Sequence, residues 1–233
     1  MTEATRKTRE PLIWKFDFAL TTFFEVETGL VSPLLPQGLT PLDVAPGISL
    51  INVTAFNFLP GGNGKLPQFQ ELTFNIIVSP DLRRGVPRFA AYVVSLASTS
   101  PDHLAHSAEV YHLPTYGTLS HVSIQKDTLT VEYGDSRGRI VTMKNCAADL
   151  SFKDSEAYIQ VFSSRNDTVY VSDVTIRGVM CEHQERGDAG ILHSHPFFGD
   201  LDVVHTEPEV YLQMISKPGE TGKQIYYPPE KLT

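Results

Sequence analysis

Hydrophobic and polar side chains alternate along residues 12–20. Large apolar residues stand at every second position from Trp14 to Leu20, and Lys15 and Asp17 lie between them. A period of two is typical of a strand with one buried face. We therefore predict a strand over residues 12–20 whose large side chains share that face.

The next segment has the markers of a short helix. Thr22 stands at the position of an N-cap, and Glu25 follows three residues later, as in a capping box. Pro33 lies beyond the segment and cannot continue a helix. The pattern predicts a helix over residues 23–30, packed outside the sheet. The other helical signals are residues 101–108 and a turn near residues 154–156.

Strand-like stretches follow in quick succession. They are rich in Val, Ile, Thr, Phe and Tyr and are bounded by Gly, Pro, Asn or Asp. The predicted strands span residues 48–58, 69–78, 87–97, 115–124, 129–133, 140–143, 158–162, 169–176 and 203–215. So many strands with so few helices predict a mainly β protein, whose large, mostly antiparallel sheet closes or folds over itself. No interdomain linker is visible, so we expect a single domain over residues 1–233, with residues 1–10 as a flexible tail.

Composition narrows the class of protein. The chain is 41% hydrophobic and 20% charged, which is ordinary for a soluble globular protein. Its net charge of −8 argues against nucleic-acid and anionic-membrane partners, because those surfaces need clustered Lys and Arg. The 2 cysteines have no CxxC spacing, and no signal peptide or membrane-length apolar run is visible. A cytoplasmic location is expected.

Several segments, in their order and spacing, resemble one known family. Residues 34–42 read LLPQGLTPL, residues 49–58 read SLINVTAFNF, and residues 89–96 read FAAYVVSL ahead of Pro101. Over residues 12–135 the chain resembles the acetoacetate decarboxylase-like superfamily. The resemblance implies a closed, cone-shaped antiparallel β-barrel with a few peripheral helices and a buried apolar pocket, usually in a homo-oligomer.

The same resemblance excludes the chemistry of the family's decarboxylases. Those enzymes form an imine on one lysine, lower its pKa with a neighbouring lysine, and handle the substrate carboxylate with a loop glutamate and an N-terminal arginine. Matched on Pro101, Asp102 falls on the imine lysine and His103 on its neighbour. Neither side chain condenses with a ketone, and residues 10–30 contain no arginine. Imine decarboxylation is therefore not expected.

The candidate catalytic residues are Asp102, His103 and Glu71. At a strand-to-helix turn, Asp102 and His103 would line the pocket and exchange protons with a carbonyl substrate, although an Asp here is also an ordinary N-cap. Glu71 begins an apolar strand. It is either a buried acid or base with a raised pKa, or a rim residue paired with Arg83 or Arg84.

Five further residues are candidates for substrate binding. The two phenylalanines among them would be core residues in most proteins, but barrels of the resembled family also line their pockets with such rings. His106 lies one helical turn beyond His103, on the same side. The predicted substrate-binding residues are Phe56, Phe58, Gln70, His106 and Tyr111.

His193 and His195 share one side of an extended segment, a spacing that metal sites use. No known metal-binding spacing completes the set, so a surface or interface pair is favoured and no metal is predicted. Nucleotide, flavin and standard hydrolase motifs are also missing from the sequence, so no other cofactor is predicted.

These observations favour a cofactor-free enzyme that binds an apolar carbonyl or polyene compound and catalyses a non-imine proton transfer, dehydration or cyclisation. A lyase, cyclase or isomerase of specialised metabolism would fit. The alternative is a non-catalytic small-molecule-binding protein on the same fold. The two hypotheses differ on whether Asp102, His103 and Glu71 face one cavity.

Overall fold

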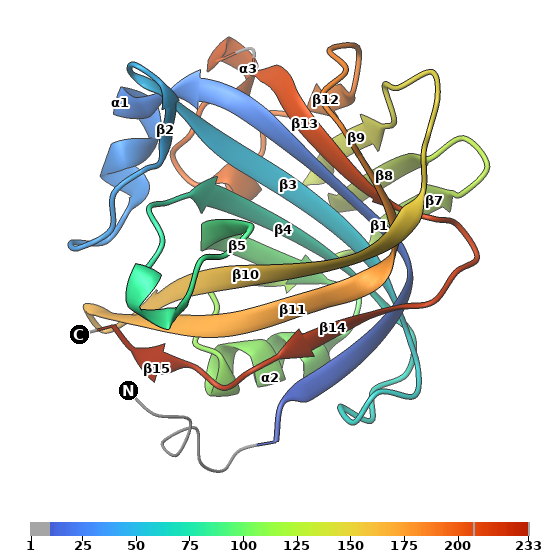
Figure 1. Ribbon diagram of the computed structural model, residues 1–233, viewed down its shortest axis with the longest axis horizontal. Helices are drawn as coiled ribbons and strands as arrows, with labels where there is room; N and C mark the ends of the chain where they lie inside the picture. Colours follow the sequence, from blue (N-terminus) through green and yellow to red (C-terminus); the bar gives the residue numbers. More distant parts are fainter. Residues whose placement is uncertain (1–9, 207, 233) are drawn as a thin grey trace.

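The computed structural model describes residues 10–206 and 208–232, without the side chains of residues 205 and 206. Its largest sheet is built from β1 Leu12–Glu27, β3 Ile48–Leu59, β4 Phe69–Ile77, β5 Phe89–Ser98, β10 Lys153–Arg165, β11 Thr168–His183, β13 Glu209–Ser216 and β14 Gly222–Tyr226. The strands pair in the order β1–β3–β4–β5–β10–β11–β14, and β14 pairs with β1 again, so the sheet closes (Figure 1). The predicted closed barrel is confirmed. The sheet is mixed, because β5 and β10 run parallel.

A second, smaller sheet lies against the outside of the barrel. Its strands pair in the order β12 Gly190–Leu192, β9 Gly138–Lys144, β8 Thr130–Asp135 and β7 His121–Gln125. The short elements are β2 Asp43–Ala45, β6 Thr115–Thr118, β15 Glu230–Lys231, α1 Thr28–Val31, α2 Pro101–Val110, α3 Val203–Thr206 and the 3-10 turns η2 Ser32–Leu34, η3 Leu82–Arg84 and η4 Pro196–Phe198. In the part of the chain that the structure describes, no helix has the length and apolar character needed to cross a membrane.

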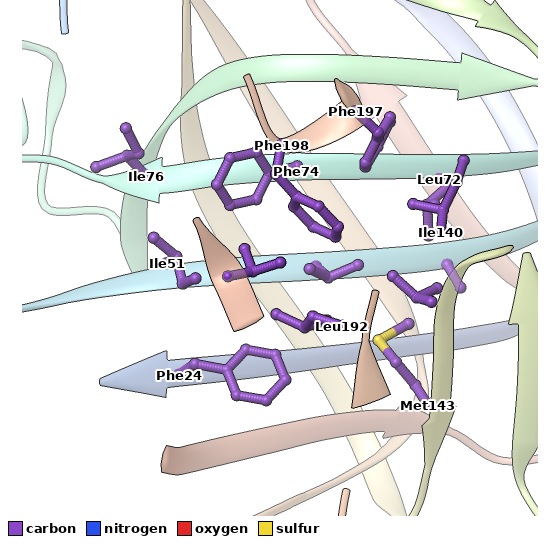
Figure 2. Close-up of a cluster of buried hydrophobic side chains, with 14 of the residues drawn as sticks. Phe24, Ile51, Leu72, Phe74, Ile76, Ile140, Met143, Leu192, Phe197 and Phe198 are labelled. Carbon is purple, nitrogen blue, oxygen red and sulfur yellow. The ribbon is translucent and has the colours of Figure 1, made fainter. Parts of the chain in front are cut away.

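The principal hydrophobic core lies between the two sheets, outside the barrel. Figure 2 shows side chains of β1, β3 and β4 packed against the smaller sheet and η4. Phe74 on β4 makes an edge contact with Phe198, with ring centroids 5.1 Å apart. Because this face carries the core, the opposite face of the same strands is free to line the inside of the barrel.

The predicted face of β1 changes sides at Asp17. Phe16 pairs with Phe58 and Phe18 with Asn57, so Asp17 is the extra residue of a β-bulge. Trp14 and Phe16 consequently pack inside the barrel, whereas Phe18 and Leu20 belong to the outer core. The prediction that all four large side chains share one face is wrong, because one inserted residue reverses the alternation.

The predicted helix over residues 23–30 is also wrong. β1 continues to Glu27, and the helix is reduced to α1. Residues Phe23 to Glu27 pair with β3 on one edge, and Phe23 to Glu25 pair with β13 on the other. Phe23 is buried inside the barrel and Phe24 in the outer core, so both faces of this segment gain apolar contacts as a strand. Tertiary burial outweighs the local capping signal.

Other element boundaries differ in instructive ways. The predicted helix over residues 101–108 is confirmed as α2, while the turn near residues 154–156 lies within β10. Residues 115–124 form two strands, β6 and β7, and residues 203–206 form α3 ahead of β13. Strand signals are weak in the short or polar strands β2, β12, β14 and β15, which the pattern did not predict. The expected tail, apart from Glu10, lies outside the described residues.

Candidate functional site

The inside of the barrel holds a cavity of about 90 Å³. Alternation along β4 places Glu71, Thr73 and Asn75 on its wall, while Leu72 and Phe74 point into the outer core. Aromatic and aliphatic side chains complete the lining, including those of Trp14, Phe56, Tyr111, Val174 and Tyr226. The cavity therefore combines a polar stripe on one side with apolar walls elsewhere.

Glu71 and His103 form a buried pair on this wall. The Oε2 atom of Glu71 lies 3.2 Å from Nε2 of His103, and the two residues are 7% and 3% exposed. β4 holds Glu71 opposite Phe56 and Ser98 on its neighbouring strands. His103 is fixed by the start of α2, where the Ser100 hydroxyl accepts a hydrogen bond from the His103 backbone N–H.

Burial favours the neutral form of both partners. It raises the pKa of Glu71 from its ordinary value of 4.5 to about 8. It lowers the pKa of His103 from 6.5 to about 3, with His106 contributing in the same direction. No lysine or arginine is among the described residues that line the cavity, so no cation there holds the Glu71 carboxylate in its charged form. At neutral pH Glu71 is therefore mainly protonated and His103 is uncharged.

The Ser107 hydroxyl shares the same ring nitrogen of His103. Its Oγ lies 3.3 Å from Nε2, while Nδ1 is buried with no hydrogen-bond partner among the described residues. A Ser-His-Glu nucleophilic triad needs the carboxylate and the serine on opposite ring nitrogens. This arrangement therefore lacks the geometry that activates a serine.

Aromatic rings fix the orientation of the His103 ring. Phe69 stacks on it with centroids 4.3 Å apart, and Trp14 meets it edge-on at 5.7 Å. Nε2 faces Glu71 and Ser107, whereas Nδ1 has no hydrogen-bond partner among the described residues. The packing leaves the imidazole a single hydrogen-bonding edge toward the cavity wall.

The predicted site residues divide into two groups. Glu71, His103, Phe56 and Tyr111 all line the cavity. The other four predicted residues do not line it; they are Asp102, Phe58, Gln70 and His106.

Asp102 is exposed on the first turn of α2. It cannot share the cavity with His103, because adjacent helical residues point about 100° apart. The expectation that Asp102, His103 and Glu71 face one cavity is therefore wrong for Asp102. Its carboxylate instead lies near the helix N-terminus, where negative charge is favourable.

The remaining three residues have other neighbours. Phe58 is fully buried and stacks on Phe56 at 4.8 Å. Gln70 alternates with Glu71 and so faces the other side of β4, where its Nε2 donates to Asn57. His106 makes an edge contact with Tyr111, with centroids 5.7 Å apart. Phe58 and His106 thus contact residues that line the cavity without lining it themselves.

The two histidines of the extended segment are not a surface pair. His195 is buried, its Nε2 lies 3.1 Å from Asp135, and its Nδ1 accepts from the Phe197 backbone at the start of η4. His193 lies beside Thr142. Within the described residues, no group of three or more possible ligands is placed to hold a metal.

Sequence reasoning missed the polar side chains beside Glu71. They are Thr21, Asn52, Thr54, Thr73, Asn75 and Ser107. The signal was present in β3 and β4, where polar residues alternate with large apolar ones. Such alternation normally predicts a solvated outer face, and here a closed barrel turns that face inward.

Several solved structures share this fold over nearly the whole chain. The enduracididine biosynthesis enzyme MppR, in complex with pyruvate, is 13% identical, with a TM-score of 0.65 over 99% of this chain and 93% of its own. An acetoacetate decarboxylase from Legionella pneumophila is 11% identical, with a TM-score of 0.63 over 100% of this chain and 92% of its own. An acetoacetate decarboxylase-like enzyme from Sphingomonas wittichii RW1 is 12% identical, with a TM-score of 0.56 over 100% of this chain and 98% of its own.

The chain thus has the acetoacetate decarboxylase-like fold, as its sequence predicted, and these structural neighbours are enzymes. No protein-family model matches the sequence, and no curated protein matches it either. Identities this low establish the fold alone, so function has to be argued from the cavity.

Proposed function

We propose that the protein is a cofactor-free enzyme that moves a proton on a small, uncharged carbonyl compound without forming an imine. Glu71 gives and takes the proton, and His103 orients the Glu71 carboxyl group. The observation that carries the proposal is the buried Glu71–His103 pair on the cavity wall. A carboxyl group with no cation beside it is costly to bury, and perturbed groups of this kind cluster at reactive sites.

The pKa of Glu71 suits this role. A general base works best when its pKa lies near the pH at which it operates. At about 8, the pKa of Glu71 makes the carboxylate a much stronger base than an exposed glutamate, while a usable fraction is ionised at neutral pH. The His103 imidazole has a pKa of about 3 and so stays neutral, as a hydrogen-bond partner of the carboxyl group.

The reaction step is an enolisation. The C–H bond next to the substrate carbonyl breaks, and its proton passes to a Glu71 carboxylate oxygen. The electron pair of that bond forms a carbon–carbon double bond, while the carbonyl π electrons move to oxygen. Return of the proton to a different carbon would give isomerisation, and loss of a neighbouring hydroxyl would give dehydration.

Size and charge of the cavity define the substrate class. A volume of about 90 Å³ holds a compound of only a few heavy atoms, which favours a small carbonyl compound over a polyene. The absence of Lys and Arg from the described lining leaves a substrate carboxylate without a counter-charge. An uncharged ketone or aldehyde is therefore favoured over a keto acid.

The test is deuterium exchange at the α-carbon of cyclopentanone and 2-butanone in D₂O, followed by proton NMR against a protein-free control. Wild-type protein should accelerate exchange, and Glu71→Gln should lower the accelerated rate by about 10²- to 10⁴-fold. Glu156→Gln is the matched control, because Glu156 is an exposed carboxylate on β10 paired with Arg177. Equal exchange with Glu71→Gln and wild type would refute the assignment of Glu71.

The alternative is a non-catalytic small-molecule-binding protein. The position of Asp102 outside the cavity favours it, since one of the three expected acid–base groups is missing from the site. Binding of a ketone without any exchange above the protein-free control would support this alternative.

We further propose a single domain, a homo-oligomer and a cytoplasmic location. Ile191 on β12 is 59% exposed and Val204 on α3 is 47% exposed, so this side of the molecule offers apolar surface for association. Cys146 and Cys181 are free thiols, which fits a reducing compartment.

A further inference from the structure

A wall of hydroxyl and amide side chains crosses the inside of the barrel beside Glu71. This polar wall consists of Thr21, Asn52, Thr54, Thr73 and Asn75, all of which line the cavity. Strand register stacks them in two rows. Thr21, Thr54 and Thr73 lie opposite one another across β1, β3 and β4, and Asn52 lies opposite Asn75 in the next row.

Hydrogen bonds inside the polar wall prepare one hydroxyl as a donor. The Asn75 amide donates to Asn52 Oδ1 at 2.6 Å and to Thr73 Oγ1 at 3.1 Å. The Thr73 oxygen is thus an acceptor already in use, while no described residue accepts the hydroxyl proton of Thr73. Thr73 is half-buried and lines the cavity, so its hydroxyl can donate this proton to a ligand oxygen that enters.

The Thr73 hydroxyl lies one side-chain repeat along β4 from Glu71 of the Glu71–His103 pair. Thr73 and Glu71 are two residues apart on the same face of the strand, which separates their Cα atoms by about 7 Å. A small carbonyl compound spans the space between them, with its oxygen at one side chain and its α-carbon at the other. Leu96, opposite Thr73 on β5, adds an apolar contact beside this position.

We propose that the Thr73 hydroxyl, held by Asn75, binds the carbonyl oxygen of the substrate while Glu71 faces the adjacent carbon. The inference rests on the proposed function and deepens it by naming an oxygen subsite. Its chemical class of ligand is a small uncharged ketone or aldehyde. Because negative charge develops on that oxygen during enolisation, the Thr73 hydrogen bond strengthens in the transition state.

The test compares two ligands that differ in one oxygen atom. Cyclopentanone and cyclopentane are titrated into the protein, and binding is followed by protein-observed NMR. Wild type should bind the ketone about 5- to 10-fold more tightly, the effect of one hydrogen bond. Thr73→Val keeps the shape of the side chain and should abolish this preference, whereas Thr73→Ser should retain it.

Thr175→Val is the matched control. Thr175 lies between Val174 and Ile176, which both line the cavity, so its own side chain faces the opposite side of β11. This variant should bind both ligands as wild type does. A preference that survives Thr73→Val, or a wild type that binds the two ligands equally or binds neither, overturns the proposed subsite.

Measuring α-deuteration in the same samples separates this inference from the proposed function. If the ketone preference depends on Thr73 but wild type shows no exchange, the enzymatic function fails and the oxygen subsite stands. If exchange occurs and Glu71→Gln, rather than Thr73→Val, removes the preference, Glu71 holds the oxygen. The subsite assignment is then wrong while the enzymatic function stands.

Discussion

Replacing Glu71 by glutamine should remove the alkaline limb of the pH–stability profile. Burial raises the pKa of Glu71 from 4.5 to about 8, so between these values the folded protein holds a proton that the unfolded chain has released. Stability therefore falls as the pH rises through this interval. The slope for one group is about 1.4 kcal/mol per pH unit.

His103 acts in the opposite sense over a lower interval. Its pKa is lowered from 6.5 to about 3, so the unfolded chain holds the extra proton there and stability is lost as the pH falls. Between pH 4.5 and 6.5 the two slopes cancel, and the contribution of the pair is flat. Above pH 6.5 Glu71 acts alone, and by pH 8 the wild type should lose roughly 2 kcal/mol.

The assay is urea unfolding of wild type, Glu71→Gln and the control Glu156→Gln at half-unit intervals from about pH 5.5 to 8.5. The difference in unfolding free energy between wild type and Glu71→Gln should shift by about 1.4 kcal/mol per pH unit in favour of Glu71→Gln throughout this range, because His103 is present in both proteins and cancels. Between pH 5.5 and pH 8 the shift should total roughly 3 kcal/mol. The control, which removes an exposed charge, should follow wild type. Parallel profiles for wild type and Glu71→Gln would refute the raised pKa and the catalytic role that depends on it.

Four further outcomes are expected. Borohydride treatment with pyruvate or acetoacetate should leave the protein mass unchanged, because no described lining residue is a lysine, and a reduced adduct would contradict this. Asp102→Asn should keep the rate of α-deuteration within about twofold of wild type and lower the free energy of unfolding in urea by at most ~1 kcal/mol, because Asp102 interacts only with the helix dipole. A large loss of α-deuteration would show that Asp102 acts in catalysis. Gly64→Ala should shift the fluorescence emission of Trp14, the chain's 1 tryptophan, because the new Cβ would lie within 3 Å of its ring. Gly117→Ala is the control: its Cβ would meet open space, so the emission should stay unchanged. Light scattering should give a mass above that of one chain, and a monomer at all concentrations would exclude the homo-oligomer.

The fold could be predicted from sequence where alternation and composition agree, as in β3, β4 and β5. The prediction of secondary structure failed where a long strand is buried on both faces. Thr22 and Glu25 form a capping signal, yet pairing with β3 and β13 on the two edges of β1 keeps residues 23–25 extended. The bulge at Asp17 is equally invisible in the sequence, because a single inserted residue leaves the local pattern of polar and apolar residues intact.

The site residues were likewise predicted only in part. His103 was predicted from its position in the resembled motif and Glu71 from its place at the start of an apolar strand, and both line the cavity. Asp102 was predicted on the same grounds as His103 and lies outside, because one helical step turns it to solvent. The polar wall was missed because only closure of the sheet shows that Thr73 and its neighbours face inward.

Because the main core lies outside the barrel, the even-numbered and odd-numbered positions of β4 face different surroundings. On β4, the even-numbered positions 72–76 hold the two sheets together, and the odd-numbered positions 71–75 face the cavity. Changes at the odd positions remove little of the packing that stabilises the fold, so they are open to variation. A library confined to them could retune the cavity for other ligands while the scaffold stays folded, which makes this strand a natural starting point for both evolution and design.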